Sequence, residues 1–485
     1  MTDFLDAATW SGRWFNGNWI KASLNADVTD KASGELLSSI GLATPEDLTS
    51  SAGIAAQAQF LWSETAPSER ASIFRRAASL VETHREELAG WIMRESGGVR
   101  AKAESELRSM LTTLHHAASM MGEPQGLMLP TAPDRMSFAR RVPHGVVGVI
   151  APFNFPLTLA IRAVAPALVT GNAVVLKPDP QTAVCGGVLI ARVFEEAGLP
   201  KGLLHVLPGG ADVGEAICKD PNIDMVAFTG STGAGRKVGA LCGAHLKKVS
   251  LELGGKNSLI VLDDADLETA ASAAAFGAWM HQGQICMATG RILAHRGIAA
   301  GLTELLRAKA EKLSAGDPYK DRVAIGPVIN NRQLTSIASI VEDSVKAGAV
   351  LHAGGTHRDL IYRPTVLGNV RPGMRAFDEE IFGPVASVTS FESDEEAIEL
   401  ANHTEYGLAA GIISRSTSRA LEIGKKLRTG LLHINDQTVL GDPHIPYGGR
   451  GASGNGSRVG GPANWDEFTQ WQWITLRDAP PAYPF

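Results

Sequence analysis

Apolar residues in the first 125 positions recur mostly at helical spacing. Over residues 73–92 they fall at three- and four-residue steps, and two glycines at 97 and 98 end the run. A second helical stretch is predicted over residues 101–121. Residues 127–143 are interrupted by two prolines, which favours a strand or an arm. The first quarter of the chain is therefore predicted to be helical and to end in an extended segment.

From Gly145 the pattern changes to short β-branched runs that alternate with amphipathic stretches. The runs are 146–150, 174–176, 203–207, 225–228 and 249–253, and the stretches between them are 157–169, 182–197, 211–219 and 234–243. This alternation predicts βαβ units and a mainly parallel, doubly wound α/β sheet. Ligands of such sheets bind at the carboxyl ends of the strands. Asn154, Lys177, Gly230 and Glu252 fall at those ends.

After Ser258 the alternation resumes, with a helix that ends near His281 and strands over 385–390, 408–413 and 431–434. This part is predicted to be a second α/β domain, and it contains Cys286. Residues 471–476 have the composition of a final strand. We expect that strand to pair with another element of this chain or with another subunit.

Composition and charge exclude several classes of protein. The 485 residues are 44% apolar and 20% charged, as in ordinary globular proteins, and the net charge of −6 gives no basic field for nucleic acid. Four cysteines without a CxxC pair predict neither a disulfide framework nor a thiolate metal site. The N-terminus lacks a signal-peptide core, and no window is apolar enough for a membrane helix. We expect a cytoplasmic protein without nucleic-acid or membrane partners.

The candidate nucleophile is Cys286, which lies in a glycine-punctuated segment with Gln284 and Thr289 close by. Thiols are strong nucleophiles, and their surroundings can lower the thiol pKa further. Upstream, Glu252 has apolar neighbours, and partial burial would raise its pKa towards neutrality and suit it to general-base work. In isolation each has a plainer interpretation, as a buried apolar cysteine and a paired structural carboxylate.

A second turn, Phe228-Thr-Gly-Ser-Thr-Gly-Ala-Gly-Arg236, follows a predicted strand and opens a predicted helix. Small residues such as Gly230 and Ser231 let a phosphate approach backbone N–H groups at the helix N-terminus. The glycine spacing matches neither the GxGxxG fingerprint nor a P-loop. Dinucleotide binding and a plain tight turn therefore both remain open for this motif.

Three further polar residues could contact ligands. Lys177 ends a strand, where its ammonium could reach a ribose or a phosphate, and Asn154 lies between two prolines, where its amide could donate to an oxyanion. Glu380 precedes an aromatic residue and a turn, and could hold a ribose. Considered separately, these residues are as well explained by a solvated lysine, a turn asparagine and a solvated loop.

Taken together and in order, the motifs resemble the NAD(P)-dependent aldehyde dehydrogenases over nearly the whole chain. The matching segments are Pro152-Phe-Asn-Phe-Pro156, Lys177-Pro178, Phe228-Thr-Gly-Ser-Thr, Leu251-Glu-Leu-Gly-Gly-Lys256, Gly283-Gln-Ile-Cys286, Glu380-Ile-Phe-Gly-Pro384 and Pro446-Tyr-Gly-Gly449. The resemblance implies that Cys286 attacks the aldehyde carbon and that the Asn154 amide and the Cys286 N–H hold the oxyanion. It also implies that Glu252 activates the water that hydrolyses the thioester.

The resemblance also implies a cofactor site and a domain plan. Lys177 and Glu380 would hold the two riboses, Ser231 a phosphate, and Phe382 would lie beside the nicotinamide. Residues 1–125 and 145–253 would form the dinucleotide domain, 254–445 the catalytic domain, and 126–144 with 466–485 an arm for a homodimer or homotetramer. NAD is the expected cofactor, but many NAD-preferring members have Glu where this chain has Pro180, so NADP stays open.

The substrate pocket carries two signals that differ. Arg162 lies in the helix expected to line the pocket, where an Arg meets a substrate carboxylate in relatives that resemble succinic semialdehyde dehydrogenases. Segments 177–183, 433–438 and 442–447 instead resemble benzaldehyde and vanillin dehydrogenases, and the apolar Leu159 and Ile285 suit an aromatic ring. We therefore expect an aromatic aldehyde, with a semialdehyde or aliphatic aldehyde as the alternative. A non-catalytic protein on the same scaffold is the remote alternative.

Overall fold

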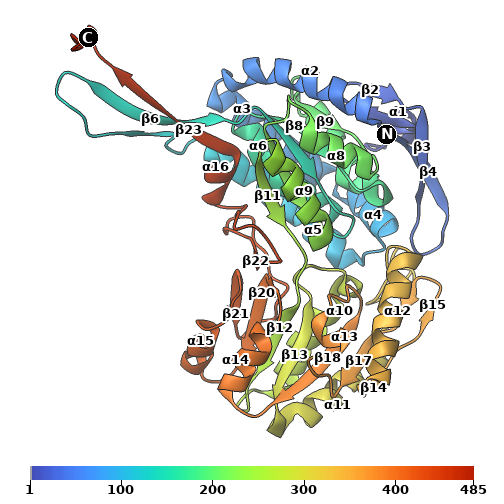
Figure 1. The fold of residues 1–485 in the computed structure, drawn as a ribbon. Helices are drawn as coiled ribbons and strands as arrows, with labels where there is room; N and C mark the ends of the chain where they lie inside the picture. The colour runs from blue at the N-terminus through green and yellow to red at the C-terminus, as the bar shows by residue number, and fades with distance from the viewer. Residues whose placement is uncertain (1–2) are drawn as a thin grey trace.

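The computed structural model describes residues 3–485, which form two lobes, each built around one sheet (Figure 1). The first sheet has the order β11-β10-β7-β8-β9-β1-β2. Its strands are β1 (Arg13–Phe15), β2 (Trp19–Lys21), β7 (Val146–Ile150), β8 (Ala173–Lys177), β9 (Leu204–Val206), β10 (Met225–Thr229) and β11 (Lys248–Glu252). The helices of this lobe are α2 (Pro45–Ser63), α3 (Pro67–Thr83), α4 (Arg85–Ser96), α5 (Arg100–Met120), α6 (Pro156–Val169), α7 (Leu189–Glu196), α8 (Ala211–Lys219), α9 (Thr232–Ala244) and α16 (Ala463–Phe468).

The five strands β7 to β11 of this sheet run parallel, as predicted. Within the parallel part of the sheet, the chain passes from β7 through β8 to β9 on one side. It then returns across the sheet and adds β10 and β11 on the other side of β7. The switch point of the sheet therefore lies between β7 and β10. A crevice at the carboxyl ends of these two strands is where doubly wound sheets bind ligands.

The second sheet has the order β14-β17-β18-β13-β12-β20-β21, and every pairing except that of β14 is parallel. Its strands are β12 (Asn257–Val261), β13 (Thr289–His295), β14 (Val350–Ala353), β17 (Thr365–Gly368), β18 (Val385–Phe391), β20 (Ala409–Ile413) and β21 (Leu431–Ile434). Its helices are α10 (Leu267–Trp279), α11 (Arg296–Lys312), α12 (Asn331–Lys346), α13 (Arg375–Asp378), α14 (Asp394–Asn402) and α15 (Thr417–Gly424). Successive residues of β12 enter different cores, Leu259 on one face of the sheet and Ile260 on the other, because side chains alternate along a strand.

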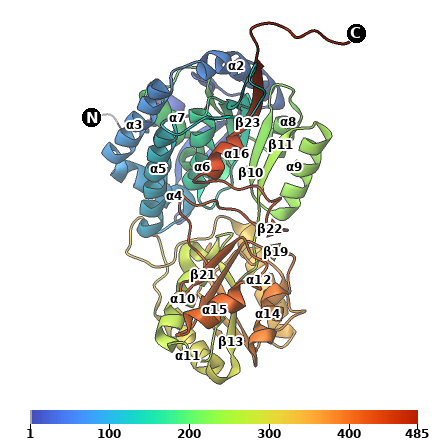
Figure 2. The same ribbon diagram turned by 90° about the vertical axis from the view of Figure 1, so that its left-hand side faces the viewer.

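A three-stranded arm projects from the first lobe, as Figures 1 and 2 show. It consists of β5 (Gly126–Met128), β6 (Met136–Pro143) and the C-terminal β23 (Thr469–Leu476). The pairing of β23 with β6 is antiparallel and runs the full length of both strands, from Thr469 opposite Pro143 to Leu476 opposite Met136. The predicted final strand thus finds its partner within this chain.

The N-terminal prediction was incomplete. In addition to helices, the segment contains β1 and β2, which extend the first sheet at its edge, and the hairpin of β3 (Leu24–Thr29) and β4 (Leu36–Leu42). The predicted helix over 73–92 is broken at His84 into α3 and α4. The other short elements are α1 (Ala7–Trp10), β15 (His357–Arg358), β16 (Ile361–Tyr362), β19 (Tyr406–Gly407), β22 (Arg450–Gly451), η1 (Pro180–Thr182), η2 (Val184–Val188) and η3 (Met280–Gly283).

The helix predicted over 182–197 begins irregularly. Its first part is a 3₁₀ turn followed by the π-helix η2, and only its second part is the α-helix α7. The buried carboxylate of Glu95 accepts hydrogen bonds from the N–H groups of Val184 and Cys185, at 2.9 and 2.7 Å. These bonds satisfy N–H groups that an irregular helix start leaves free.

The cysteines are all free thiols, and Cys185, Cys218 and Cys242 are buried, as their apolar surroundings predict. Among the helices of residues 3–485, none combines the length and apolarity needed to cross a bilayer. Within the same residues, His, Cys, Asp and Glu side chains form no group of three that could hold a metal ion.

Candidate active site

The edge of the first sheet formed by the carboxyl ends of its parallel strands brings together residues that lie far apart in the sequence. Lys177 is the last residue of β8, Gly230 directly follows β10, and Glu252 ends β11, so the prediction that they lie at strand ends is confirmed. Ser231 is the N-cap of α9, and its hydroxyl accepts a hydrogen bond from the Ala234 N–H. The N-terminus of α9 therefore lies at this edge of the sheet and presents backbone donors and the positive end of a helix dipole there.

Asn154 lies in the turn between β7 and α6 and is only 3% exposed. Its Nδ2 donates to the backbone carbonyl of Gln284 at 3.0 Å. A side-chain amide carries two N–H donors. One of them is therefore engaged in fixing the group against the Cys286 loop, and the second is left for a ligand.

A buried ion pair that sequence reasoning missed supports the Asn154 turn. Glu106 of α5 accepts hydrogen bonds from the N–H groups of Leu157 and Thr158, at 3.0 and 3.1 Å, which caps the N-terminus of α6. Its other carboxylate oxygen accepts from the ammonium of Lys102, and both side chains are fully buried. The spacing of four residues on a predicted helix was the signal available in the sequence.

Cys286 lies on the segment between η3 and β13, in a backbone that few residue types tolerate. His281 and Gln282 have φ angles of 46° and 55°, and Gly283 follows with 67°. Such left-handed conformations are costly for residues with a β-carbon and persist where the surroundings enforce them. Gly255 packs against this loop, since a β-carbon there would lie 2.5 Å from the Cys286 carbonyl oxygen. The predicted Gly-rich turn thus permits close approach to the cysteine.

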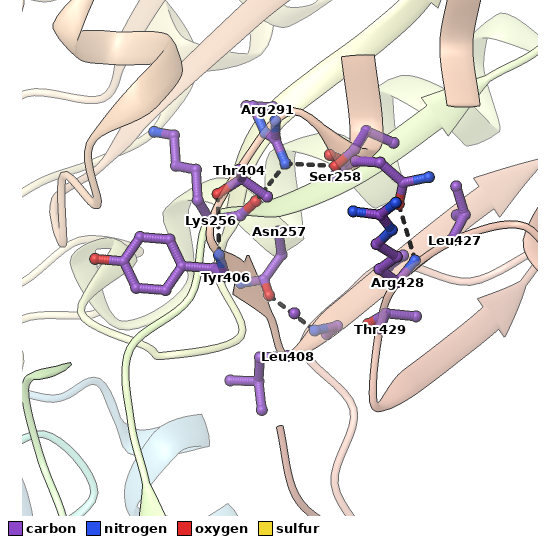
Figure 3. Close-up of a pocket in the computed structure, with 15 residues that line it drawn as sticks. Lys256, Asn257, Ser258, Arg291, Thr404, Tyr406, Leu408, Leu427, Arg428 and Thr429 are labelled. Atoms are coloured by element: carbon purple, nitrogen blue, oxygen red, sulfur yellow. Dashed lines mark hydrogen bonds between the residues drawn. The ribbon is translucent and has the colours of Figure 1, made fainter. Parts of the chain in front are cut away.

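Asn257, at the start of β12, holds the loop that contains Cys286 through the backbone carbonyls of that loop. Its Nδ2 donates to the carbonyls of Cys286 and Ala288, at 2.8 and 2.9 Å, and its Oδ1 accepts from the Ala409 N–H at 2.9 Å. Figure 3 shows Asn257 beside Lys256 among the residues that line a small hollow. The volume of this hollow is about 20 Å³. This hollow is too small for an aldehyde and its cofactor. The hydrogen bonds of Asn257 position the Cys286 backbone.

The thiol of Cys286 contacts Tyr447, whose Oη lies 3.4 Å from Sγ. Burial raises the Cys286 pKa, and the Tyr447 hydrogen bond and the charge of Arg162 act in the opposite direction. Desolvation is the largest effect, so the surroundings as a whole do not lower this pKa. Tyr447 lies within a motif used for the family resemblance, but the sequence did not assign it a contact with the thiol.

Arg162 lies next to the Cys286–Tyr447 pair and is held by two contacts. Its Nη2 donates to Thr229 Oγ1 at 3.0 Å, and its guanidinium lies 5.0 Å from the centre of the Tyr447 ring. The side chain is half-buried. Its charge acts on both Cys286 and Glu252.

Glu252 is 4% exposed, and its Oε1 has no hydrogen-bond partner within residues 3–485. Burial raises its pKa to about 8, against the opposing charges of Arg162 and Arg458. The predicted rise in pKa is confirmed, and desolvation is its cause. Its ionised form, which predominates above about pH 8, can take a proton from water, as a general base requires.

One cavity of about 280 Å³ joins several of these residues. Asn154, Leu159, Arg162, Ile285 and Cys286 all line it, so the predicted pocket residues are brought together with the thiol. The rest of its wall is largely apolar and aromatic, with Phe155, Phe276, Met280, Met287, Val439, Leu440, Tyr447 and Val459. Such a cavity is suited to an apolar ligand whose polar group lies at the thiol.

The remaining predicted contacts lie around the crevice. Glu380 accepts a hydrogen bond from the Gly255 N–H at 3.0 Å, and burial raises its pKa to about 7. Phe382 has a φ of 52°, and its ring meets that of Phe153 edge to face at 6.0 Å. Lys177 is buried, and its pKa is lowered by burial, against the charges of Asp179 and Asp212.

The site as a whole combines a thiol, an amide donor and a buried carboxylate near the carboxyl edge of a doubly wound parallel sheet. The sequence matches the aldehyde dehydrogenase family over residues 19–474. A vanillin dehydrogenase from Amycolatopsis sp. is 52% identical over 484 residues, which cover 99% of this chain and 100% of that protein. A benzaldehyde dehydrogenase (NAD+) from Pseudomonas putida is 50% identical over 487 residues, and 100% of each is covered.

Solved structures agree with these matches. A salicylaldehyde dehydrogenase from Pseudomonas putida G7, complexed with salicylaldehyde, has a TM-score of 0.94 and 34% identity, and the match covers 98% of this chain and 99% of that one. The chain belongs to the aldehyde dehydrogenase family.

Proposed function

We propose that this protein oxidises an aromatic aldehyde to the carboxylic acid with NAD, through a thioester on Cys286. The observation that carries the proposal is the shared cavity, in which the Cys286 thiol and the Asn154 amide meet an apolar and aromatic wall. The names of the relatives support it, since the vanillin, benzaldehyde and salicylaldehyde dehydrogenases are all named for aromatic aldehydes.

The first half of the reaction is addition of the thiol to the aldehyde. The Cys286 sulfur forms a bond to the carbonyl carbon, and the carbonyl oxygen becomes an oxyanion held by the free N–H of Asn154 and the Cys286 backbone N–H. Because burial raises the Cys286 pKa, the thiol gives up its proton to solvent water as the carbon–sulfur bond forms. Tyr447 and Arg162 favour the thiolate by a hydrogen bond and by charge.

The second half is hydrolysis of the thioester. Glu252 takes a proton from water, the hydroxide oxygen bonds to the acyl carbon, and the carbon–sulfur bond breaks to return the Cys286 thiolate. Over the whole cycle one aldehyde, one NAD and one water give one carboxylate, one reduced cofactor and two protons. The Oε1 of Glu252 has no hydrogen-bond partner within residues 3–485, which supports this role because no protein donor has to be displaced when a water binds.

The residues around the crevice fit a dinucleotide. The α9 N-terminus with Ser231 suits a phosphate, and open space surrounds the Cα of Gly233, so backbone there can be approached closely. Lys177 and Glu380 would hold the riboses, and Phe382 would lie beside the nicotinamide. When bound, NAD accepts the hydride that leaves the substrate carbon. We assign 1–125 and 145–253 to the cofactor domain and 254–445 to the catalytic domain.

Aromatic aldehydes should be preferred over semialdehydes, because Arg162 is already held by Thr229 and Tyr447. These contacts fix the orientation of the guanidinium, and an aromatic ring would pack on the apolar wall of the cavity. We expect kcat/KM for benzaldehyde to exceed that for succinic semialdehyde by at least about 100-fold. Initial rates of cofactor reduction measure kcat/KM for each of the two aldehydes. Preference for the semialdehyde would make Arg162 a carboxylate clamp and contradict the aromatic assignment.

The same assay with NADP tests the choice of cofactor that Pro180 left open. Asp179 and Asp212 both place negative charge near Lys177. A 2′-phosphate on the ribose would be repelled by these carboxylates, so we expect NAD to be used at least about tenfold better than NADP in kcat/KM. Equal use of both cofactors would show that the two carboxylates do not face the ribose.

We further propose a cytoplasmic homodimer or homotetramer assembled through the arm. The arm exposes apolar side chains that a monomer would leave in water, and Trp473 on β23 is 67% exposed. The other exposed apolar residues of the arm are Leu127, Met128, Met136, Trp471 and Leu476. Its edge strand β5 also presents unpaired backbone groups.

A further inference from the structure

Helix α5 contains two buried charged side chains that have no part in the proposed chemistry. Lys102 and Glu106 lie one helical turn apart and are both fully buried, and the Lys102 ammonium lies 2.5 Å from Glu106 Oε1. Removing two charges from water costs free energy, and their attraction offsets this cost only where the other donors and acceptors of the pair are also bound. The partners of the pair therefore identify the part of the protein that it holds in place.

The second carboxylate oxygen of Glu106 caps the N-terminus of helix α6. It accepts hydrogen bonds from the N–H groups of Leu157 and Thr158, at 3.0 and 3.1 Å. The N-cap residue of α6 is Phe155, whose side chain makes no capping hydrogen bond. A carboxylate from another helix therefore takes over this function. Asn154 directly precedes Phe155, so the cap fixes the turn that carries the oxyanion donor.

Lys102 contacts the same turn through an aromatic ring. Its ammonium lies 5.0 Å from the centre of the Phe155 ring, and that ring meets the His281 ring edge to face at 5.2 Å. His281 is buried and has a φ of 46° in the strained segment that leads to Cys286. The pair thus supports the turn of the oxyanion donor and, through one ring, contacts the segment of the nucleophile.

The spacing between these two segments determines how well the site holds an oxyanion. A hydrogen bond joins them directly, from Asn154 Nδ2 to the Gln284 carbonyl at 3.0 Å. The free N–H of Asn154 and the backbone N–H of Cys286 must both point to the position of the oxyanion before the reaction starts. A misplacement of about 1 Å at such a group can cost about 100-fold in rate. A rigid support for the Asn154 turn therefore contributes to the rate of thiol addition.

We propose that the Lys102–Glu106 pair is a positioning element for the oxyanion site and acts on thiol addition through Asn154. This inference rests on the proposed function and deepens it, because it gives a role in the reaction to two residues that do not line the aldehyde cavity. Glu106 fixes the start of α6. Lys102 supplies the opposite charge that a buried carboxylate needs.

Glu106→Gln is the first test, because glutamine has nearly the same size and no charge. We expect kcat for benzaldehyde to fall about 10- to 100-fold, while KM for benzaldehyde and for NAD changes less than about threefold. Glu104→Gln is the matched control, since it removes a carboxylate two residues away on α5 that pairs with the partly exposed Arg85 and Arg100. Its kcat should not change. A loss equal to that of Glu106→Gln would show a general effect on α5 and overturn the inference.

A second variant guards against loss of the fold. Glu106→Gln leaves the Lys102 ammonium buried without its carboxylate, whereas Lys102→Met/Glu106→Gln removes both charges. Thermal unfolding should show that the double variant is folded, and its kcat should be as low as that of Glu106→Gln. A double variant that is folded and fully active would contradict the proposal.

A comparison with Asn154→Ala shows whether the pair acts through the amide. In the Asn154→Ala background, Glu106→Gln should cause no further loss of kcat, since the group that it positions is already absent. A loss in that background as large as in the unmodified protein would show that the pair acts elsewhere, and the inference would fall. If the unmodified protein oxidises no aromatic aldehyde, the proposed function fails instead.

Discussion

Replacement of Cys286 by alanine should abolish aldehyde oxidation, with a loss of at least about 10⁴-fold in kcat. The sulfur supplies the bond that holds the substrate through oxidation, and within residues 3–485 the other three cysteines are buried away from the cavity. The variant should still fold and bind NAD, since the removed group is small and lies in a cavity. Initial rates of cofactor reduction measure the loss, and quenching of protein fluorescence by NAD or NADH checks cofactor binding.

The matched control for this variant is Cys218→Ala. Cys218 is fully buried on α8, and its Sγ donates to the Gly214 carbonyl at 3.3 Å. Its loss should cost some stability and leave turnover nearly unchanged. Turnover that persists in Cys286→Ala would exclude the covalent mechanism, whatever the control shows.

Glu252→Gln should separate the two halves of the reaction. The amide cannot take a proton from water, so the thioester should form at a near-normal rate and hydrolyse about 10² to 10⁴-fold more slowly. A stopped-flow trace should show a burst of reduced cofactor, close to one per active site, followed by a slow phase. An unchanged steady rate would remove Glu252 from the role of base.

The pH dependence of hydrolysis follows from the same group. Glu252 acts as a base only without its proton, and its pKa is raised to about 8 by burial. When hydrolysis limits turnover, the rate should therefore rise with pH through about 8 and level off above it. The glutamine variant should lose this dependence. A rate that falls over this range would have the wrong sign for a general base.

The sequence predicted the parallel sheets because β-branched runs and amphipathic stretches alternate clearly after Gly145. It also placed Lys177, Gly230 and Glu252 at strand ends, since each directly ends or follows such a run. The short strands β1 and β2 were missed: each has three residues and includes a tryptophan, and neither forms an apolar run. Their strand character comes from pairing with β9 and with each other.

Sequence patterns could not predict which side chains contact one another within the site. The positions of Tyr447 and Cys286 are distant in the chain, and only the fold brings Oη to within 3.4 Å of Sγ. The sequence alone leaves Arg162 as either a carboxylate clamp or a structural arginine, and its hydrogen bond to Thr229 and its cation–π contact with Tyr447 favour the second.

The most direct test of the covalent mechanism is the mass of the Glu252→Gln protein after mixing with benzaldehyde and NAD. We predict an increase equal to one benzoyl group less one hydrogen, mapped by peptide analysis to Cys286 and absent when NAD is omitted. An adduct on another residue, or an unmodified protein that has nevertheless produced one equivalent of reduced cofactor, would contradict a thioester on Cys286.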